Sequence, residues 1–203
     1  MHISEGILSA PVLISGAVLA AAGTAVGLKK LDYERIPQVA VLSAAFFIVS
    51  LVHVPIGPSN VHLILNGLIG LLLGWVAFPA ILVGLLLQAI LFQFGGFTSL
   101  GVNISVMSFP AVLCFYAFRR GVRNEKAGLS MLSSFMCGFC SVLLGGILVA
   151  LALTFTGKSF INAAKVIVIA HLPVMIIEGL IVVGCVKFLK KVKPEILEVI
   201  YDG

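Results

Sequence analysis

Residues 62–94 read HLILNGLIGLLLGWVAFPAILVGLLLQAILFQF, and no Lys, Arg, Asp or Glu interrupts them. One helix needs about 20 mainly apolar residues to cross a bilayer, and this run is longer. The whole chain of 203 residues has the same character: 61% is hydrophobic, 10% is charged, and the mean hydropathy is +1.21. Soluble domains are about 45–50% apolar and about 25% charged. The sequence therefore predicts an all-α membrane protein, forming one domain over residues 1–203.

Basic side chains separate the apolar runs in a pattern that predicts topology. All Lys and Arg residues except Lys158 and Lys165 fall within residues 29–35, 119–126 and 187–193. Because Lys and Arg favour cytoplasmic loops, we expect seven transmembrane helices, an outer N-terminus and a cytoplasmic C-terminus. The expected spans are residues 7–28, 37–54, 62–78, 79–94, 104–118, 127–154 and 165–189. The third and fourth spans are short, so one interrupted hairpin is the alternative to two crossings.

In this topology all four histidines, His2, His53, His62 and His171, fall on the outer side. A free terminal amine, the amide nitrogen of residue 2 and the Nδ1 atom of His2 can close fused chelate rings around one ion. The set is planar because the peptide unit is flat, and it suits ions that prefer square-planar nitrogen ligands, chiefly Ni(II) and Cu(II). A fourth nitrogen from His62 or His53 would complete the plane. We favour His62, which is expected to begin a helix and to point into the bundle.

Short polar segments beside these histidines are expected to support the site. The segment that begins Met1–Gly6 carries Ser4 and Glu5 in a chain that is otherwise sparing with polar groups. Ser59 and Asn60 lie in a loop stiffened by two prolines, where they could fix the orientation of a histidine ring.

The last span contains a second polar pair. Glu178 is the only acidic residue deep in an expected helix, and it follows His171 by seven positions, so the two share a helical face. Intramembrane carboxylates are rare and usually paired or functional. We expect His171 and Glu178 to hold the bundle around the site, without naming either as a ligand.

The first span is rich in small residues, which allow helices to approach closely. Ala17, Ala21 and Ala25 form one strip at four-residue spacing, and Gly23 and Gly27 lie on another. One strip could pack internally while Ala17, Ala21 and Ala25 dock a different membrane protein; internal packing alone is the simpler reading. Cys137 and Cys140 sit inside an apolar run with no companion ligands nearby, so we expect them to be packing residues.

Three stretches together resemble a known family. They are the opening Met-His-Ile-Ser-Glu-Gly, the Ser-Asn-Val-His-Leu around His62, and His-Leu-Pro-Val-Met-Ile-Ile-Glu-Gly from His171. Over essentially the whole chain, the sequence resembles the cobalt/nickel substrate-binding (S) components of energy-coupling-factor transporters, the CbiM/NikM family. The resemblance implies that the first residues tuck back into a seven-helix bundle. It also implies that the metal is bound by the Met1 amine, the amide and ring of His2, and His62.

The same resemblance implies partners and a location. They are a transmembrane coupling (T) component, cytoplasmic ATPase subunits and often a small accessory membrane subunit, in the inner membrane of a bacterial or archaeal cell. The sequence contains no Gly-x-x-x-x-Gly-Lys-[Ser/Thr] phosphate-binding loop, so we expect a multi-pass subunit that is not an enzyme and borrows its ATP hydrolysis. We interpret the basic residues as markers of the cytoplasmic loops of a chain embedded in membrane lipid. No nucleic-acid partner is therefore expected.

The expected cargo is Ni²⁺, or Co²⁺. The planar nitrogen set favours nickel, but the usual affinity order makes cobalt only somewhat weaker. Because the nitrogen ligands must lose protons to bind metal, affinity should fall as the pH drops below neutrality. The alternatives are a self-sufficient metal channel or proton-coupled carrier that uses His171 and Glu178, and an intramembrane enzyme, for which no better constellation of residues is found.

Overall fold

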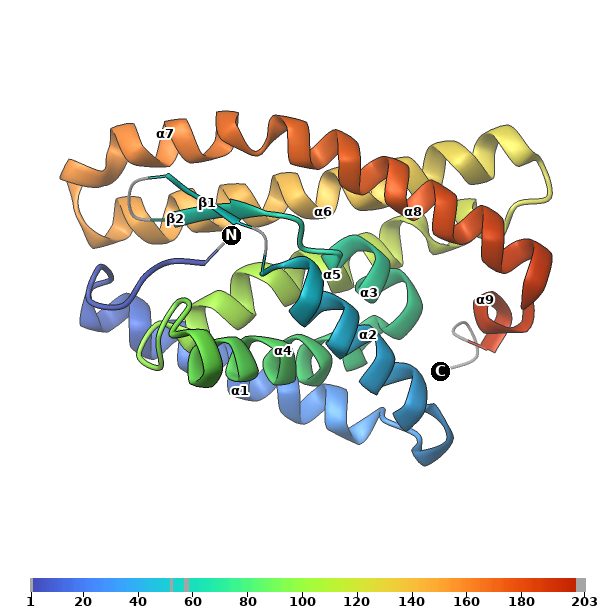
Figure 1. Ribbon diagram of the computed structural model, residues 1–203, viewed down its shortest axis with the longest axis horizontal. Helices are drawn as coiled ribbons and strands as arrows, with labels where there is room; N and C mark the ends of the chain where they lie inside the picture. Colours follow the sequence, from blue (N-terminus) through green and yellow to red (C-terminus); the bar gives the residue numbers. More distant parts are fainter. Residues whose placement is uncertain (1, 52, 57–58, 200–203) are drawn as a thin grey trace.

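The computed structural model describes residues 2–51, 53–56 and 59–199, and their side chains except those of residues 53–56, 59–61 and 198–199. The fold is an elongated helical bundle in which α7 and α8 follow one long edge and α1 the other (Figure 1). The elements in chain order are α1 (Ala10–Lys29), η1 (Tyr33–Arg35), α2 (Ile36–Val49), β1 (His53–Ile56), β2 (Ser59–His62), α3 (Asn66–Leu73), η2 (Gly74–Val76), α4 (Ala77–Phe92), α5 (Leu100–Arg123), α6 (Ala127–Thr156), η3 (Lys158–Phe160), α7 (Ile161–Ala170), α8 (Leu172–Val192) and α9 (Glu195–Val199).

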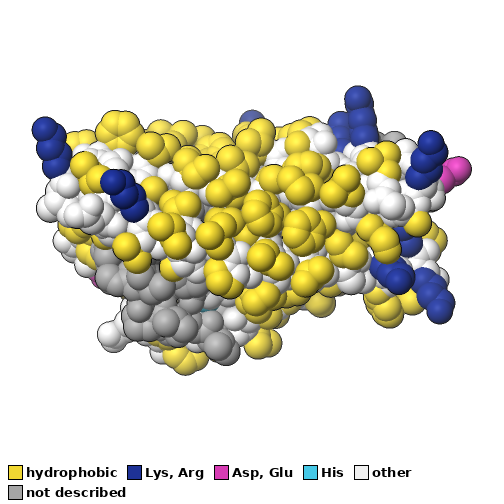
Figure 2. Space-filling model, turned by 90° about the horizontal axis from the view of Figure 1, so that it is seen from above, with side chains coloured by type: hydrophobic (Ala, Val, Ile, Leu, Met, Phe, Trp, Pro, Cys, Tyr) yellow, Lys and Arg dark blue, Asp and Glu magenta, His cyan; other side chains and the backbone are white. Residues whose placement is uncertain are grey.

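Five segments of the described chain are long and apolar enough to cross a membrane: Ala10–Lys29, Asn66–Phe92, Leu100–Arg123, Ala127–Thr156 and Lys158–Val192. Helix α2 has 14 residues, fewer than the roughly 20 that a full crossing needs. Large apolar side chains such as Ile14, Val18 and Leu180 point away from the bundle. Figure 2 shows hydrophobic side chains covering the middle of one face, with most Lys and Arg side chains nearer its two ends. Such a surface is suited to lipid.

Contacts between segments define two ends of the bundle. At one end, which we call the N-terminal end, Ser9 N–H donates to Thr156 Oγ1 and Ile3 pairs with Asn103. At the other, the basic end, the Arg35 guanidinium donates to Leu72 O and the Lys190 ammonium to Asn124 O. The basic end carries every Lys and Arg except Lys158 and Lys165. The charge pattern of the sequence therefore corresponds to one end of the fold.

The segment Asn66–Phe92 reverses direction at η2. Its first part, α3, runs towards the basic end, where Trp75 Nε1–H donates to Tyr116 OH. Its second part, α4, runs back, so that the Gln88 amide donates to Phe47 O near the end of α2. Helix α3 is short because the chain reaches it from the hairpin only at Asn66. Figure 1 shows α3 and α4 as two separate arms.

The loop before α3 departs from the sequence-based expectations. His62 was predicted to begin a helix, and this is wrong: His53–Ile56 and Ser59–His62 form a two-stranded antiparallel hairpin, with His53 opposite His62. His53 was predicted to end the second span, but α2 already ends at Val49. The fold is thus helical with one small sheet, because paired strands satisfy backbone groups in a segment where two prolines hinder a helix.

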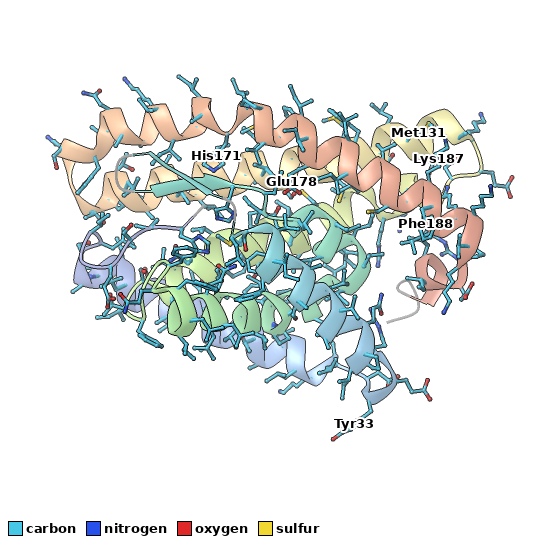
Figure 3. The ribbon with its side chains drawn as sticks, viewed as in Figure 1. Tyr33, Met131, His171, Glu178, Lys187 and Phe188 are labelled. Carbon is cyan, nitrogen blue, oxygen red and sulfur yellow. The ribbon has the colours of Figure 1, made fainter. Side chains whose placement is uncertain are left out.

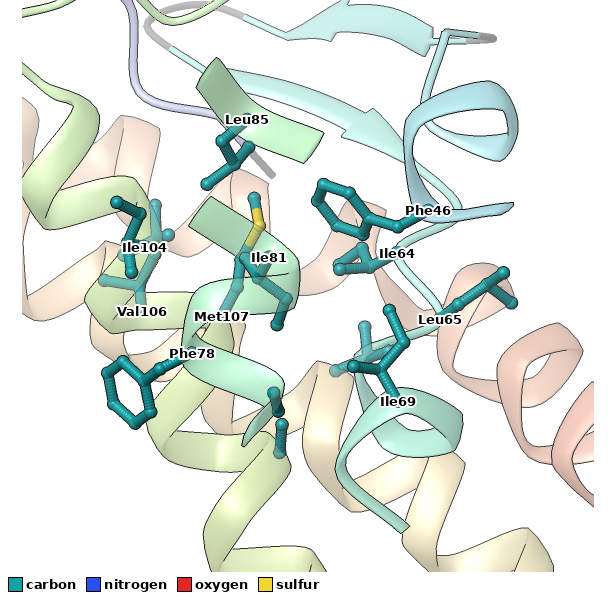
Figure 4. Close-up of a cluster of buried hydrophobic side chains, with 14 of the residues drawn as sticks. Phe46, Ile64, Leu65, Ile69, Phe78, Ile81, Leu85, Ile104, Val106 and Met107 are labelled. Carbon is teal, nitrogen blue, oxygen red and sulfur yellow. The ribbon is translucent and has the colours of Figure 1, made fainter. Parts of the chain in front are cut away.

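A continuous core joins α3, α4 and α5. Phe78, Ile81 and Met107 are fully buried in it, and Figure 4 shows them clustered with residues of the α3 start. Helix α1 closes this core with small residues. Gly23 lies so near the Phe78 ring that a Cβ atom there would collide with it. The Gly23 and Gly27 strip therefore packs inside the protein.

Candidate metal site

The N-terminal segment runs into the bundle and is held by α5. Ile3 N–H donates to Asn103 Oδ1 at 2.9 Å, and Asn103 Nδ2–H donates to Ile3 O at 3.1 Å. The Ile3 side chain is fully buried in the main core. His2, next to it, is only 2% exposed. Met1, which the sequence proposes as a ligand, lies outside the described residues.

The segment brings His2 against His62. The two imidazole rings stack with centroids 4.6 Å apart and an interplanar angle of 22°. His62 is 3% exposed, and its Nδ1 lies 2.6 Å from the carbonyl oxygen of Leu63. An Nδ1–H that donates to this carbonyl leaves Nε2 with its lone pair, which is the form of imidazole that binds metals.

The surroundings of His62 favour its neutral form. The ring is buried against the His2 ring, and burial disfavours a charged imidazolium. A neutral imidazole can accept a metal without first losing a proton. Two residues 60 positions apart in the sequence thus meet in a buried setting.

The hairpin places His62 at the end of β2, and its first strand places His53 directly opposite in register. The side chains of His53, Ser59 and Asn60 lie outside the described ones, so their support of the site stays a prediction. Helix α3 then begins after Leu65, which has a left-handed backbone with φ 55°.

Glu178 holds the junction between this strand and α3. Its Oε1 accepts hydrogen bonds from Ile64 N–H and from Leu65 N–H, the latter at 2.8 Å. A helix start leaves backbone N–H groups without partners in the helix, and Glu178 supplies an acceptor to such groups from α8. Figure 3 shows Glu178 on the side of α8 that faces α3. The Glu178 side chain is fully buried. Its two hydrogen bonds therefore fix the backbone that directly follows the strand carrying His62.

His171 occupies the turn between α7 and α8 rather than one unbroken helix. Its ring is fully buried and its Nδ1 lies 2.7 Å from Ile167 O, one turn earlier. Its Nε2 is buried and has no hydrogen-bond partner within the described part of the chain.

Ser4 and Glu5 follow Ile3 at the edge of the site. Ser4 is half-buried and Glu5 is exposed. Glu5 Oε1 accepts a long hydrogen bond of 3.4 Å from Thr98 N–H. The structure therefore places Glu5 against the α4–α5 loop.

Asn103 is the residue that the sequence interpretation missed. Residues 95–103 were expected to be an external loop, but α5 already begins at Leu100, so Asn103 lies inside its first turn. It is buried and contacts the N-terminal segment from a position 100 residues away. The one available signal was an amide in an apolar helix, which hydrogen bonding between helices would also explain.

Within the described residues, no group of three or more His, Cys, Asp and Glu side chains is placed to hold a metal ion. Cys114, Cys137, Cys140 and Cys185 are free thiols that line or border a second apolar cluster. The described side chains thus offer a pair of imidazoles, those of His2 and His62.

Residues 2–196 match the family described as CbiM, cobalt uptake substrate-specific transmembrane region. The chain belongs to the CbiM family. Among its relatives is the "Putative metal transport protein" of Haemophilus influenzae, 46% identical over 199 residues that cover 97% of each chain. The "Putative cobalt transport protein CbiM 1" of Methanocorpusculum labreanum is 30% identical and matches 98% of this chain and 92% of its own.

A solved structure also resembles this member of the CbiM family. The crystal structure of a transition metal transporter superposes with a TM-score of 0.77 at 27% identity, covering 99% of this chain and 98% of the other. The family resemblance expected from the sequence is confirmed. The chain is a membrane component of transition-metal transport, and the comparisons extend over the helical bundle and the N-terminal segment alike.

Proposed function

We propose that this CbiM-family chain is the substrate-binding component of an ATP-driven uptake system for a divalent transition metal. It captures the ion outside the cell through the Met1 amine, the amide nitrogen and ring of His2, and the His62 ring. The observation that carries this proposal is the buried stack of His2 and His62, 4.6 Å between centroids. Each metal–nitrogen bond is about 2 Å long, so binding one ion requires the two rings to rotate out of this stack until a nitrogen of each points at it.

The cargo is nickel in preference to cobalt. The family description names cobalt, whereas a planar set that includes an ionised amide nitrogen suits Ni(II) better. Two imidazoles without other ligands would not favour Ni(II) strongly over Co(II). The preference therefore depends on the terminal amine and the amide nitrogen, which are the two ligands that side-chain substitution leaves untouched.

The chain crosses the membrane seven times in this proposal, with the N-terminal end outside and the basic end in the cytoplasm. The alternating direction of α1, α2, α3, α4, α5, α6 and the α7–α8 pair supports this topology. The short α2 and α3 are completed by the segments around them, namely η1 and the hairpin. The concentration of Lys and Arg at one end supports the orientation.

Transport requires partners, because the sequence carries no phosphate-binding loop for ATP. The proposed partners are a transmembrane coupling component, cytoplasmic ATPase subunits and a small accessory membrane subunit. Ala17, Ala21 and Ala25 are exposed on α1, on a different strip from the buried Gly23 and Gly27, and this exposed strip is the proposed docking face. Ala21→Leu should leave metal binding unchanged and reduce co-purification of the coupling component; an undiminished complex would exclude this face.

The experiment that tests the site compares two purified proteins in detergent. One has its native N-terminus, and the other has a single extra residue before Met1, which keeps every side chain and removes the amine from its place. Calorimetric titration with Ni²⁺ should show one site in the native protein, with the visible absorption of planar Ni(II), and no such site in the extended one. Equal binding by both would overturn the terminal chelate.

A self-sufficient channel or carrier built on His171 and Glu178 is the rival function. One Glu178 oxygen is already committed to two backbone N–H groups, which favours a structural role for this carboxylate. Reconstituted vesicles containing this chain alone separate the two functions. Nickel flux without partners and without ATP would support the rival, whereas saturable binding without flux is expected for the substrate-binding component.

A further inference from the structure

Asn103 contacts the N-terminal segment in a way that resembles strand pairing. A carboxamide carries the same donor and acceptor as a peptide group. The Asn103 side chain accepts a hydrogen bond from Ile3 N–H and donates one to Ile3 O, so both of its groups bind the same residue. We propose that Asn103 is a positioning residue that fixes the register of the N-terminal segment and so sets His2 against His62. Its effect on metal binding rests on the function proposed above; its effect on His2 does not.

The register argument follows from the neighbouring side chains. In an extended segment successive side chains point to opposite sides, so a slip of one residue exchanges the two faces. At the observed register Ile3 fills the core and His2 stacks on His62. A slip by one position would place the half-buried Ser4 in the Ile3 pocket and separate His2 from His62. Two hydrogen bonds to a single backbone residue oppose that slip.

Asn103 is itself held in place from the α4–α5 loop. Asn103 Nδ2–H also donates to Ser99 Oγ at 3.3 Å, and the Ser99 hydroxyl donates to Gly95 O at 2.7 Å. Gly95 has a φ of +79°, and a Cβ atom there would lie 2.9 Å from Asn103 Nδ2. The loop therefore leaves space for the amide and helps to direct it towards Ile3.

The first test needs no metal. Asn103→Asp preserves the size of the side chain and its acceptor for Ile3 N–H, but sets a carboxylate oxygen against Ile3 O. Carbethoxylation of His2 by diethyl pyrocarbonate, followed by mass spectrometry, should be slow in the metal-free native protein, where His2 is buried. In Asn103→Asp it should be about tenfold faster or more, because the hydrogen bond to Ile3 O is lost and that buried acceptor is left without a donor.

A matched control is available at the same end of the bundle. Gln88 is a buried amide whose Nε2–H donates to Phe47 O and to Ser50 Oγ, and it receives the same amide-to-carboxylate change in Gln88→Glu. This control should lower the melting temperature and leave His2 protected. Protection of His2 retained in a folded Asn103→Asp protein, or lost equally in Gln88→Glu, would overturn the proposal. If Asn103→Asp does not fold, Asn103→Ala is read in the same way.

The second test adds Ni²⁺. Asn103→Asp should weaken binding by about 10- to 100-fold, the range typical when a residue that orients a ligand is replaced. At saturation its absorption spectrum should match that of the native protein, because the ligands themselves remain. Once His2 is replaced by Ala, the Asn103→Asp change should have no further effect on residual binding. Exposure of His2 without any loss of nickel affinity would keep Asn103 as a positioning residue and reject the terminal chelate.

Discussion

The two ends of the bundle use their polar groups in different ways. At the N-terminal end, buried side chains hold backbone atoms: Asn103 pairs with Ile3, and Glu178 accepts from Ile64 and Leu65 N–H. At the basic end, Arg119 lies over the Phe115 and Tyr116 rings, 5.2 and 5.1 Å from their centroids. An uncompensated buried polar group is costly, whereas a charge near the surface gains little from one partner. The buried hydrogen bonds at the N-terminal end set the geometry of the candidate site. The basic side chains at the other end are a signal of orientation in the membrane.

The largest effect is expected from the rings themselves. His62→Ala removes the only histidine ring that stacks on His2 in the described chain, and it should abolish the high-affinity Ni²⁺ site in a calorimetric titration. The apparent affinity should fall by at least about 100-fold, because three nitrogens and water replace four nitrogens. Arg119→Ala, at the other end, serves as the control and should titrate like the native protein. Unchanged binding in His62→Ala would separate the stack from the site.

The pH dependence of binding sharpens the difference between the rings and the terminus. The His62 ring is buried, and burial disfavours its charged form, so we expect this ring to release no proton when it binds the ion. An α-amino group has a pKa of about 7.7–8.0, and it must lose a proton, as must the amide nitrogen. If both protons are displaced, nickel affinity should fall about 100-fold for each pH unit below 7. A constant dissociation constant between pH 8 and 6 would indicate a site built from side chains alone.

The sequence predicted that His2 and His62 lie together and missed the residues that hold them there. His2, His62 and Glu178 stood out because polar residues are rare in apolar runs, and the structure brings His2 and His62 together. The partner of Glu178 could not be predicted, since it is the backbone of residues 64 and 65 and depends on where α3 begins. For the same reason the helix expected at His62 was wrong. The Asn103–Ile3 pairing spans 100 positions, and no local pattern records it.

An intermediate effect is expected at Glu178. Glu178→Ala leaves the N–H groups of Ile64 and Leu65 buried without their acceptor, and such unpaired groups cost about 1–3 kcal/mol each. The free energy of unfolding should fall by about 2–6 kcal/mol, measured by denaturant titration in detergent. Glu178→Gln retains an oxygen acceptor and should lose about 1 kcal/mol. Equal losses in the two variants would mean that the charge, and not the contact with α3, stabilises the junction.

The smallest effect is expected at the basic end. Arg119→Ala removes a guanidinium from two aromatic faces, Phe115 and Tyr116, and a cation–π contact near a surface contributes about 0.5–1 kcal/mol. The unfolding free energy should fall by about that amount, with nickel affinity and the protection of His2 unchanged. Arg119→Lys retains the charge but not the flat guanidinium, so it should recover part of the loss. Weaker nickel binding in either variant would show that the two ends are coupled. The basic end could then no longer be assigned to membrane orientation alone.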